Sequence, residues 1–239
     1  GYSDDDYVNR SAEVLSDRNK VISSADMLFT VRSAAAAGDV GMQLAEQMKD
    51  GQTLIGMMEP YAQHKSFSVL AENKVTAFAM ELMPRITRAQ SMDVLSSMAN
   101  LGGYKAALIA ADNLPKMFPM MMTAAGTVTP ARVFIIGVGV AGLQAIATCR
   151  RLGALVSAYD IRPTVKEQVM SLGAKFVEMV LEAESAEDSG GYAREMDEEF
   201  YRRQRELMRD VLIESDVLIT TAAIPGKKSP VLVTEEMVK

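Results

Sequence analysis

A glycine-rich stretch in the second half of the chain constrains the fold more than any other feature. Residues 133–136, Val-Phe-Ile-Ile, are apolar and β-branched or aromatic, which is typical of a buried strand. They run directly into the pattern Gly137-x-Gly139-x-x-Gly142, and residues 143–148 that follow favour a helix. A strand, a tight glycine turn and a helix in this order predict the beginning of a βαβ unit.

Each glycine of this turn has a separate physical role. Gly137 permits the tight turn, Gly139 lets the backbone approach a pyrophosphate, and Gly142 lets the helix pack closely on the strand. The start of the helix adds free N–H groups and the positive end of the helix dipole. A second predicted strand, residues 154–159, ends in Asp160, 18 residues after Gly142, where an acid can bond a ribose hydroxyl. We therefore predict a dinucleotide-binding unit, and the alternative is a glycine-rich turn in an unrelated α/β protein.

Composition and charge narrow the class of protein. The chain has 239 residues, of which 49% are hydrophobic and 23% charged, as in ordinary soluble globular proteins. A net charge of −6 argues against nucleic acid as a partner. The single cysteine, Cys149, lies inside the predicted helix, which indicates a buried structural thiol. The longest uncharged run, residues 133–149, is too short and too glycine-rich to span a membrane.

The N-terminal third of the chain predicts an α/β domain of its own. It contains three strand candidates and one helix between the last two of them, at residues 27–31, 53–57, 75–80 and 66–73 respectively. Strands that alternate with helices favour a parallel sheet with helices on both faces. Residues 34–38 are predicted to form a loop. A long linking helix is expected at residues 88–114, and the domain boundary near residue 126, so that the first domain covers residues 1–126.

Residues 127–239 are predicted to form the second domain. Residues 120–127 form a compact connection to it in this interpretation, and an acidic loop is expected at residues 182–191. Four strands and three helices are expected, with strands at residues 133–136, 154–159, 175–179 and 216–221 and helices at residues 143–148, 163–172 and 193–215. A dinucleotide fold of the usual kind has six strands. The predicted class is therefore α/β, with two Rossmann-like doubly wound domains joined by a long helix, both incomplete in this chain. Because the chain begins at Gly1, we also expect a cut or processed polypeptide.

A group of polar residues precedes the glycine turn. Gln90, Asp93 and Ser96 recur at a spacing of three, which places them on one face of the predicted helix. Arg85, just before that helix, could reach the same place. An amide, a carboxylate and a hydroxyl on one face can hold a polar ring in a fixed orientation. The alternative, which sequence physics alone favours, is a solvated helix face.

From about residue 75 onward, the sequence resembles the NAD(H)-binding domain of proton-translocating nicotinamide nucleotide transhydrogenase. The likeness is carried by four long motifs, MELMPRITRAQSMDVLSSMANLGGYKA, FPMMMTAAGTVTPARVFIIGVGVAGLQAIA, GGYAREMDEEF and TTAAIPGKKSPVL. The resemblance implies a soluble two-domain homodimer that passes a hydride from NADH to NADP⁺ on a separate partner domain. It implies coupling to a proton-translocating membrane domain, at the cytoplasmic face of a bacterial inner membrane or the matrix side of mitochondria.

The resemblance also implies roles for individual residues. Arg85, Asp93 and Ser96 correspond to family residues around the nicotinamide and its ribose, and Gln90 to one that reaches toward the partner nucleotide. No general base is expected, because the cofactors do the chemistry, and no metal site is predicted. The implied cofactor-binding set comprises Gly137, Val138, Gly139, Val140, Ala141, Gly142, Asp160, Ile161, Arg162, Gly191, Tyr192, Thr220, Thr221 and Ala222. Asp160 favours NAD(H) over NADP(H), whereas Arg162 could accommodate a 2′-phosphate.

Two departures from the common family pattern and two rival functions are open at this point. The departures are Gly102-Gly103, where Ala-Gly is usual, and Ala223, where Leu is common. An alanine dehydrogenase shares the glycine turn, but that family relies on a catalytic histidine after a strand of the first domain. Here the only histidine, His64, lies beyond Glu59-Pro60-Tyr61, and we interpret it as an exposed helix residue. A non-enzymatic NAD-binding module is the other rival, and the polar residues 90–96 argue against it.

Overall fold

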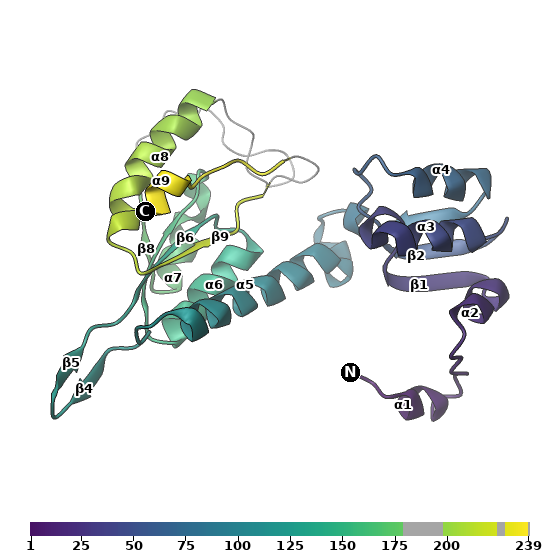
Figure 1. The fold of residues 1–239 in the computed structure, drawn as a ribbon, viewed down its shortest axis with the longest axis horizontal. Coiled ribbons are helices and arrows are strands. Elements are labelled where there is room, and N and C mark those ends of the chain that lie inside the picture. The colour runs from purple at the N-terminus through teal and green to yellow at the C-terminus, as the bar shows by residue number, and fades with distance from the viewer. Residues whose placement is uncertain (179–197, 224–227, 239) are drawn as a thin grey trace. The chain divides into compact units, whose positions relative to one another are not determined.

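The computed structural model describes residues 1–178, 198–223 and 228–238, and Figure 1 labels its elements. The described chain forms two compact units, Gly1–Val94 and Leu95–Lys239, and each is described by itself. Among the described residues, no helix combines the length and apolar character that crossing a bilayer requires.

The first unit is built on a parallel sheet of three strands in the order β1-β2-β3. Its elements are α1 (Asp4–Val8), α2 (Arg18–Ser24), β1 (Met27–Arg32), η1 (Ala34–Ala37), α3 (Gly38–Gln47), β2 (Thr53–Met57), α4 (Lys65–Glu72), β3 (Thr76–Ala79), η2 (Met80–Leu82) and η3 (Thr87–Met92). Leu28 of β1 pairs with Leu54 of β2, so these two side chains share one face of the sheet. Leu44 of α3 and Leu70 of α4 are buried with them in one core (Figure 1).

The opposite face of this sheet is apolar but exposed. Phe29, Ile55 and Phe78 lie in one row across the three strands. The side chains of Phe29 and Phe78 are 74% and 55% exposed. Right-handed crossovers that lay down parallel strands in one direction place their helices on the same side. The described helices between the strands therefore cover one face, whereas the sequence predicted helices on both.

The three predicted strands of this unit are confirmed to within a few residues, but helix α3 was not predicted. The sequence predicted a loop at residues 34–38, where the structure has η1 and the start of α3. Two glycines within four residues, Gly38 and Gly41, lower the helix propensity of this stretch. Gly41 has a packing role instead, because a Cβ atom there would lie 1.9 Å from the carbonyl oxygen of Ala34.

The second unit contains a parallel four-stranded sheet in the order β8-β7-β6-β9. Its elements are α5 (Val94–Asn113), β4 (Met121–Thr123), β5 (Gly126–Val128), β6 (Arg132–Ile136), α6 (Val140–Arg151), β7 (Leu155–Tyr159), η4 (Pro163–Val165), α7 (Lys166–Ser171), β8 (Lys175–Phe176), α8 (Glu198–Ile213), β9 (Val217–Thr220) and α9 (Glu235–Val238). Along the chain the strands of this sheet are placed third, second, first and fourth. This is the beginning of the Rossmann strand order, so the predicted α/β Rossmann-like fold is confirmed.

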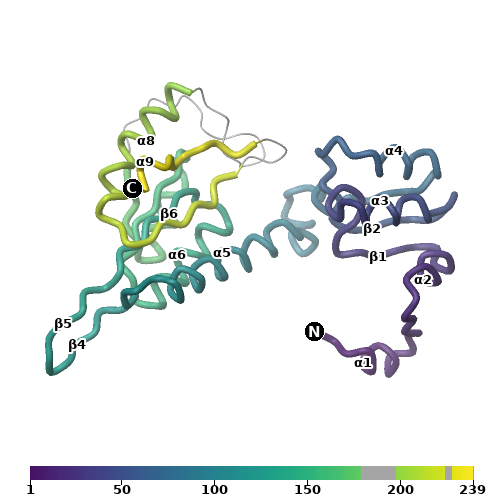
Figure 2. The backbone as a smooth tube through the Cα atoms, in the orientation of Figure 1, coloured from purple at the N-terminus to yellow at the C-terminus, as the bar shows by residue number. Residues whose placement is uncertain are grey.

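Helices cover both faces of the second sheet (Figures 1 and 2). Alternate residues of β6 point to opposite sides, as expected for a strand. Val133 and Ile135 belong to a core with residues of α5, α6 and α7, whereas Phe134 and Ile136 pack with Met208 of α8. Because β6 is buried on both faces, its sequence is a continuous apolar run rather than an alternating one.

The predicted helix at residues 88–114 is divided in the structure. Residues 87–92 form the 3₁₀ helix η3, Asp93 has a non-helical ψ of 88°, and α5 then runs from Val94 to Asn113 without a break at Gly102-Gly103. An aspartate is favoured directly before a helix, because its carboxylate can accept hydrogen bonds from N–H groups of the first turn. The prediction that Gln90, Asp93 and Ser96 share one helix face is therefore wrong.

The connection before the second sheet is a β-hairpin rather than an irregular segment. Strands β4 and β5 pair antiparallel, with Met121 opposite Val128 and Thr123 opposite Gly126. The Thr123 hydroxyl donates to the Gly126 carbonyl over 3.2 Å and accepts from the Ala125 amide over 3.2 Å, which closes the two-residue loop. This loop lacks the Asn-Gly or Asp-Gly pair that commonly marks a hairpin, so the sequence did not predict it.

Candidate functional site

The glycine turn lies at the carboxyl end of β6, where the strand order of the second sheet reverses between β6 and β9. Gly137 has a φ of 91°, which favours glycine, and its amide donates to the Tyr159 carbonyl over 2.9 Å. On the other side, the Thr221 hydroxyl donates to the Gly137 carbonyl over 2.8 Å. The turn is thus fixed to the ends of β7 and β9, at the crevice where doubly wound sheets bind ligands.

The three glycines of the turn differ in what surrounds them. A Cβ atom on Gly137 would lie 2.7 Å from the Ala222 nitrogen, and one on Gly142 would lie 1.9 Å from the Gly137 oxygen. A Cβ atom on Gly139 would have no neighbour within 4 Å. The fold itself therefore requires glycine at the first and third positions but leaves the space beside Gly139 open.

The open space beside Gly139 fits a phosphate group. Gly139 is the N-cap residue of α6 and has no side chain to bond the N–H groups of the first turn. Those N–H groups and the positive end of the helix dipole favour an anion at this position. Val140 is half exposed there, and Val138 is buried beneath the turn. The residues present therefore suit the pyrophosphate of a dinucleotide.

Asp160 follows β7 and bonds directly to the glycine turn. One carboxylate oxygen, Oδ2, accepts from the Val138 amide over 2.7 Å, and the other, Oδ1, accepts from the Arg162 amide over 2.9 Å. The residue is only 8% exposed. The position predicted for a ribose-binding acid is therefore occupied by a carboxylate that also holds the shape of the turn.

Arg162 forms a two-point ion pair with Asp160. Its Nε lies 2.8 Å from Oδ1, and its Nη2 lies 2.9 Å from Oδ2. Nη2 also donates to the Val138 carbonyl over 3.2 Å. The side chains of Arg162 and Asp160 are 13% and 6% exposed. The arginine that sequence analysis assigned to a possible 2′-phosphate is thus bonded to the acid beside it.

A buried hydrogen bond joins α8 to the end of β7. The Gln204 amide nitrogen donates to the Tyr159 hydroxyl over 3.0 Å, and both side chains are buried. Burial raises the pKa of Tyr159 to about 12. Gln204 was not predicted as a member of the site, although a signal exists: it occupies the buried position between Phe200 and Met208, four residues from each.

Helix α5 approaches the start of α6 closely. A Cβ atom on Gly103 would lie 2.0 Å from the Ala141 carbonyl oxygen, whereas one on Gly102 would meet nothing within 4 Å. Of the two adjacent glycines that the sequence singled out, Gly103 is the one required by packing. It lets α5 lie against the first turn of the helix that begins at the glycine turn.

The residues predicted to surround the nicotinamide do not lie on one element. Arg85 is exposed in the segment before η3, and Gln90 is exposed within η3. Asp93 is half-buried at the end of η3 and belongs, with Arg85 and Gln90, to the first unit. Ser96 is half-buried in the first turns of α5 and belongs to the second unit.

The remaining predicted site residues are distributed as follows. Thr221 and Ala222 contact Gly137 at the carboxyl end of β9, which Thr220 completes. Ile161 is half-buried between Asp160 and Arg162. Gly191 and Tyr192 lie outside the described residues.

His64 and Cys149 have structural surroundings. His64 is the N-cap of α4 rather than an exposed helix residue, and its Nδ1 accepts from the Ser66 amide over 3.3 Å. The sulfur of Cys149 is buried within α6, and this burial raises the pKa of the thiol to about 11. Cys149 is therefore the buried thiol that the sequence predicted.

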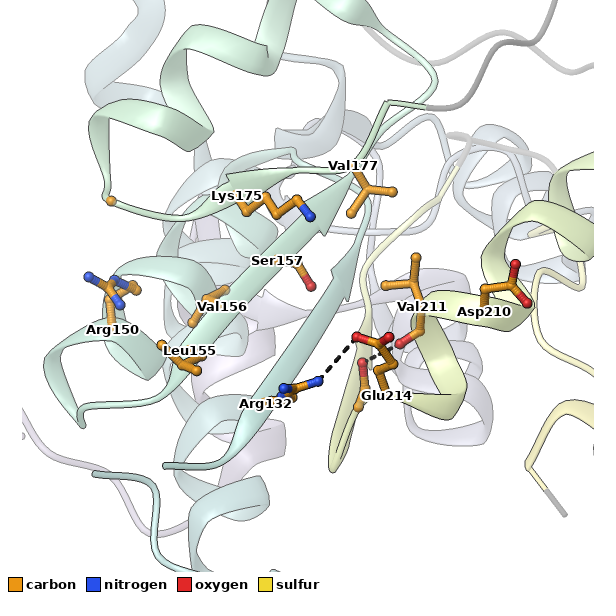
Figure 3. Close-up of a pocket in the computed structure, with 12 residues that line it drawn as sticks. Arg132, Arg150, Leu155, Val156, Ser157, Lys175, Val177, Asp210, Val211 and Glu214 are labelled. Carbon is orange, nitrogen blue, oxygen red and sulfur yellow. Dashed lines mark hydrogen bonds and ion pairs between the residues drawn. The ribbon is translucent and has the colours of Figure 1, made fainter. Parts of the chain in front are cut away.

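A second hollow, of about 590 Å³, opens at the other end of the second sheet (Figure 3). Arg132, Leu155 and Lys175, near the amino ends of their strands, line it together with Asp210 and Glu214 of α8. The Arg132 guanidinium lies 3.1 Å from the Glu214 carboxylate. Ligands of doubly wound sheets bind at the carboxyl ends of strands, so we place the functional site at the glycine turn.

Comparison with known families agrees with this placement. The profile of the alanine dehydrogenase/PNT C-terminal domain matches residues 106–239, and that of the alanine dehydrogenase/PNT N-terminal domain matches residues 1–102. The chain belongs to the alanine dehydrogenase/PNT family. This membership confirms the family that the sequence motifs indicated.

Individual members of the alanine dehydrogenase/PNT family separate its two branches. An NAD(P) transhydrogenase subunit alpha of Rhodospirillum rubrum is 49% identical over 237 residues, which cover 99% of this chain and 62% of that protein. The crystal structure of transhydrogenase from Sinorhizobium meliloti matches with a TM-score of 0.81 and 44% identity, over 99% of this chain and 61% of that one. Alanine dehydrogenase 2 of Staphylococcus aureus is 27% identical over 241 residues, or 57% of that protein. The chain thus spans about three-fifths of the length of these relatives and is more similar to the transhydrogenases.

Proposed function

We propose that this chain is the NAD(H)-binding component of a proton-translocating NAD(P) transhydrogenase. The observation that carries the proposal is the open space at Gly139, between the start of α6 and the carboxylate of Asp160. This space suits a pyrophosphate with a ribose beside it. It occurs in a chain that is 49% identical to a relative named as an NAD(P) transhydrogenase subunit.

The bound nicotinamide supplies the chemistry of the proposed reaction, in which a hydride passes between C4 of NADH and C4 of NADP⁺. The residues of this chain bind and orient the donor. The N–H groups that begin α6 hold the pyrophosphate, and Asp160 accepts from an adenosine-ribose hydroxyl. Such fixation matters because hydride transfer requires the two rings at a set distance and angle, and misplacement by about 1 Å can cost on the order of a hundredfold in rate.

The nicotinamide end is assigned to Arg85, Asp93 and Ser96, with Gln90 directed toward the partner nucleotide. An arginine, a carboxylate and a hydroxyl can bond a carboxamide and a ribose, which fixes the ring without a general base. The division of the chain into domains at about residue 126, with residues 1–126 and 127–239 on either side, belongs to the same proposal.

The alanine dehydrogenase activity is the second candidate. In the first unit, the segment after β2 contains Glu59, whose backbone has a φ of 52°, and its amide donates to the Glu81 carboxylate over 2.7 Å. The nearby His64 caps α4 through its ring nitrogen. A histidine engaged as a helix cap does not suit the role of a general acid in alanine oxidation, so this candidate is the weaker one.

The proposed partners are an NADP(H)-binding domain, a proton-translocating membrane domain and a second copy of this chain. The hairpin of β4 and β5 supports the homodimer, because its Met121 and Met122 are 41% and 79% exposed. Exposed apolar side chains on a paired ribbon are typical of a surface that another chain covers. We propose that the component lies at the membrane surface, on the cytoplasmic or matrix side, and NADP(H) on the partner domain.

Equilibrium titration tests the proposal against its rivals. The full-length protein is titrated with NADH and NADPH, and the complex is then given NAD⁺ with L-alanine, or NADH with an NADP⁺-loaded partner domain. The proposal predicts tighter binding of NADH than of NADPH, and oxidation of NADH only with the partner domain. Reduction of NAD⁺ by L-alanine would favour the dehydrogenase, and NADH binding without either reaction would favour a binding module.

A further inference from the structure

The Asp160 carboxylate is fully engaged within the chain. An ionised carboxylate offers about four acceptor positions. Here Oδ1 accepts from the backbone amide and Nε of Arg162, over 2.9 and 2.8 Å, and Oδ2 accepts from the Val138 amide and Arg162 Nη2, over 2.7 and 2.9 Å. Two of these four bonds come from the Arg162 guanidinium, the group best suited to bind a phosphate in two-point geometry.

We propose that Arg162 is a latent receptor for the 2′-phosphate of a phosphorylated dinucleotide, and that its ion pair with Asp160 keeps this receptor closed. The proposal rests on the proposed function, because it concerns the nucleotide at the glycine turn. It assigns the selectivity for NAD(H) to two effects of one carboxylate. Asp160 repels a 2′-phosphate directly, and it also holds the guanidinium that would otherwise neutralise that phosphate.

The geometry explains why the guanidinium stays on Asp160. Arg162 is held at three points, since Nη2 also donates to the Val138 carbonyl over 3.2 Å. Turning it toward a phosphate would leave Asp160, which is 8% exposed, as a buried carboxylate without its charge partner. Removing one member of a buried ion pair is strongly unfavourable. A 2′-phosphate would thus have to displace Arg162 from Asp160 while standing beside the same negative charge.

Removing the carboxylate should therefore open the receptor. In Asp160→Ala, the arginine loses its charge partner and remains at the rim of the ribose site, two residues further along the chain. A charge-assisted two-point bond to phosphate is roughly twice as strong as a neutral one. We expect Asp160→Ala to bind NADPH and 2′,5′-ADP about tenfold or more tightly than the wild type, while its affinity for NADH and 5′-ADP falls.

The double variant Asp160→Ala/Arg162→Ala isolates the contribution of the arginine. It should lose the gain in NADPH and 2′,5′-ADP affinity while its affinity for 5′-ADP stays at the level of Asp160→Ala. Asp160→Ala/Arg151→Ala is the matched control, because Arg151 is an exposed arginine at the far end of α6. A helix of 12 residues places that control about 18 Å from the turn. The control should keep the gain.

The experiment is isothermal titration of the full-length protein and these variants with all four nucleotides. Circular dichroism verifies the fold, and Asp160→Asn, whose amide oxygen can still accept from Val138, replaces Asp160→Ala if the latter does not fold. An NADPH gain that depends on Arg162 and not on Arg151 supports the proposal. Equal NADPH affinity in Asp160→Ala and in Asp160→Ala/Arg162→Ala would overturn it. A wild-type protein that binds neither NADH nor 5′-ADP would instead contradict the proposed function itself.

Discussion

Gly103 of α5 lies against the backbone of Ala141, so closely that a Cβ atom on Gly103 would stand 2.0 Å from the Ala141 carbonyl oxygen. Ala141 belongs to the first turn of α6, which begins at the glycine turn. The position of α5 and the position of the phosphate-binding helix are therefore set by the same contact. A methyl group at this contact cannot be accommodated unless one of the two helices moves, because both partners are backbone.

The two adjacent glycines of α5 give a matched pair of variants. We expect Gly103→Ala to lower the free energy of unfolding by about 1–3 kcal/mol, as overpacking does, and to weaken NADH binding. Gly102→Ala meets open space, so it should stabilise the protein by up to about 1 kcal/mol through helix propensity alone. Chemical denaturation and NADH titration of both variants measure this. Equal effects at the two positions would show that the close contact does not exist.

The glycine turn yields a second matched set. Gly139→Ala places its methyl group in open space at a φ of −86°, so its free energy of unfolding should stay within about 0.5 kcal/mol of the wild type. Its affinity for NADH should nevertheless fall by about tenfold or more, because the methyl group occupies the place of a phosphate. Gly142→Ala should destabilise the fold itself. If Gly139→Ala bound NADH normally, the pyrophosphate would not lie at this position.

The buried pair of Tyr159 and Gln204 predicts non-additive stability. Tyr159→Phe leaves the Gln204 amide buried without its partner, which should cost about 1–3 kcal/mol. Gln204→Met fills a similar volume without a polar group, so the double variant should be more stable than the sum of the single changes indicates. Urea denaturation of the four proteins gives the coupling energy. A coupling of zero would contradict the hydrogen bond.

The same tyrosine predicts a pH dependence at the alkaline end. Burial raises the pKa of Tyr159 from 10.0 to about 12, so the folded protein keeps a proton there that the unfolded chain has lost. The stabilisation is present below pH 10 and is lost as the pH rises toward 12. Tyr159→Phe should therefore lose less free energy of unfolding than the wild type between these two pH values. Parallel slopes for both proteins would show that the hydroxyl is not buried.

Asp93 separates a positioning role from a structural one. Asparagine is as favourable as aspartate directly before a helix, so Asp93→Asn should change the free energy of unfolding by less than about 0.5 kcal/mol. If the carboxylate orients the nicotinamide or its ribose, hydride transfer should slow by on the order of a hundredfold with little loss of NADH affinity. Single-turnover transfer and equilibrium titration measure the two quantities. A wild-type transfer rate would return Asp93 to a structural role, and complete loss of NADH binding would assign affinity to this segment.

The strands and the glycine turn could be predicted because their signals are local. Buried parallel strands are continuous apolar runs, as at residues 133–136, and the turn has fixed spacings. Helix α3 and the β4–β5 hairpin were missed because their local signals are weak, with glycines in one and no turn dipeptide in the other. The break at Asp93 was missed because helical periodicity continues across it, even though an aspartate can also begin a helix.

The contacts of the site depend on geometry that the sequence does not contain. Asp160 and Arg162 are two residues apart, and that spacing is compatible with an arginine that faces a phosphate or one that faces the acid. The two-point contact decides between these in the described structure. The Gln204–Tyr159 bond joins residues 45 positions apart, so only the packing of α8 on the sheet reveals it.

Direct hydride transfer is the measurement that tests the central claim. NADH labelled with tritium at C4 of the nicotinamide is bound to the full-length protein, mixed with an NADP⁺-loaded partner domain, and followed through a single turnover. We predict that the label appears in NADPH without exchange into water, and that Gly139→Ala, which leaves the fold intact, removes the transfer at NADH concentrations that saturate the wild type. Label that passes into water, or transfer that proceeds equally well with Gly139→Ala, would contradict the account.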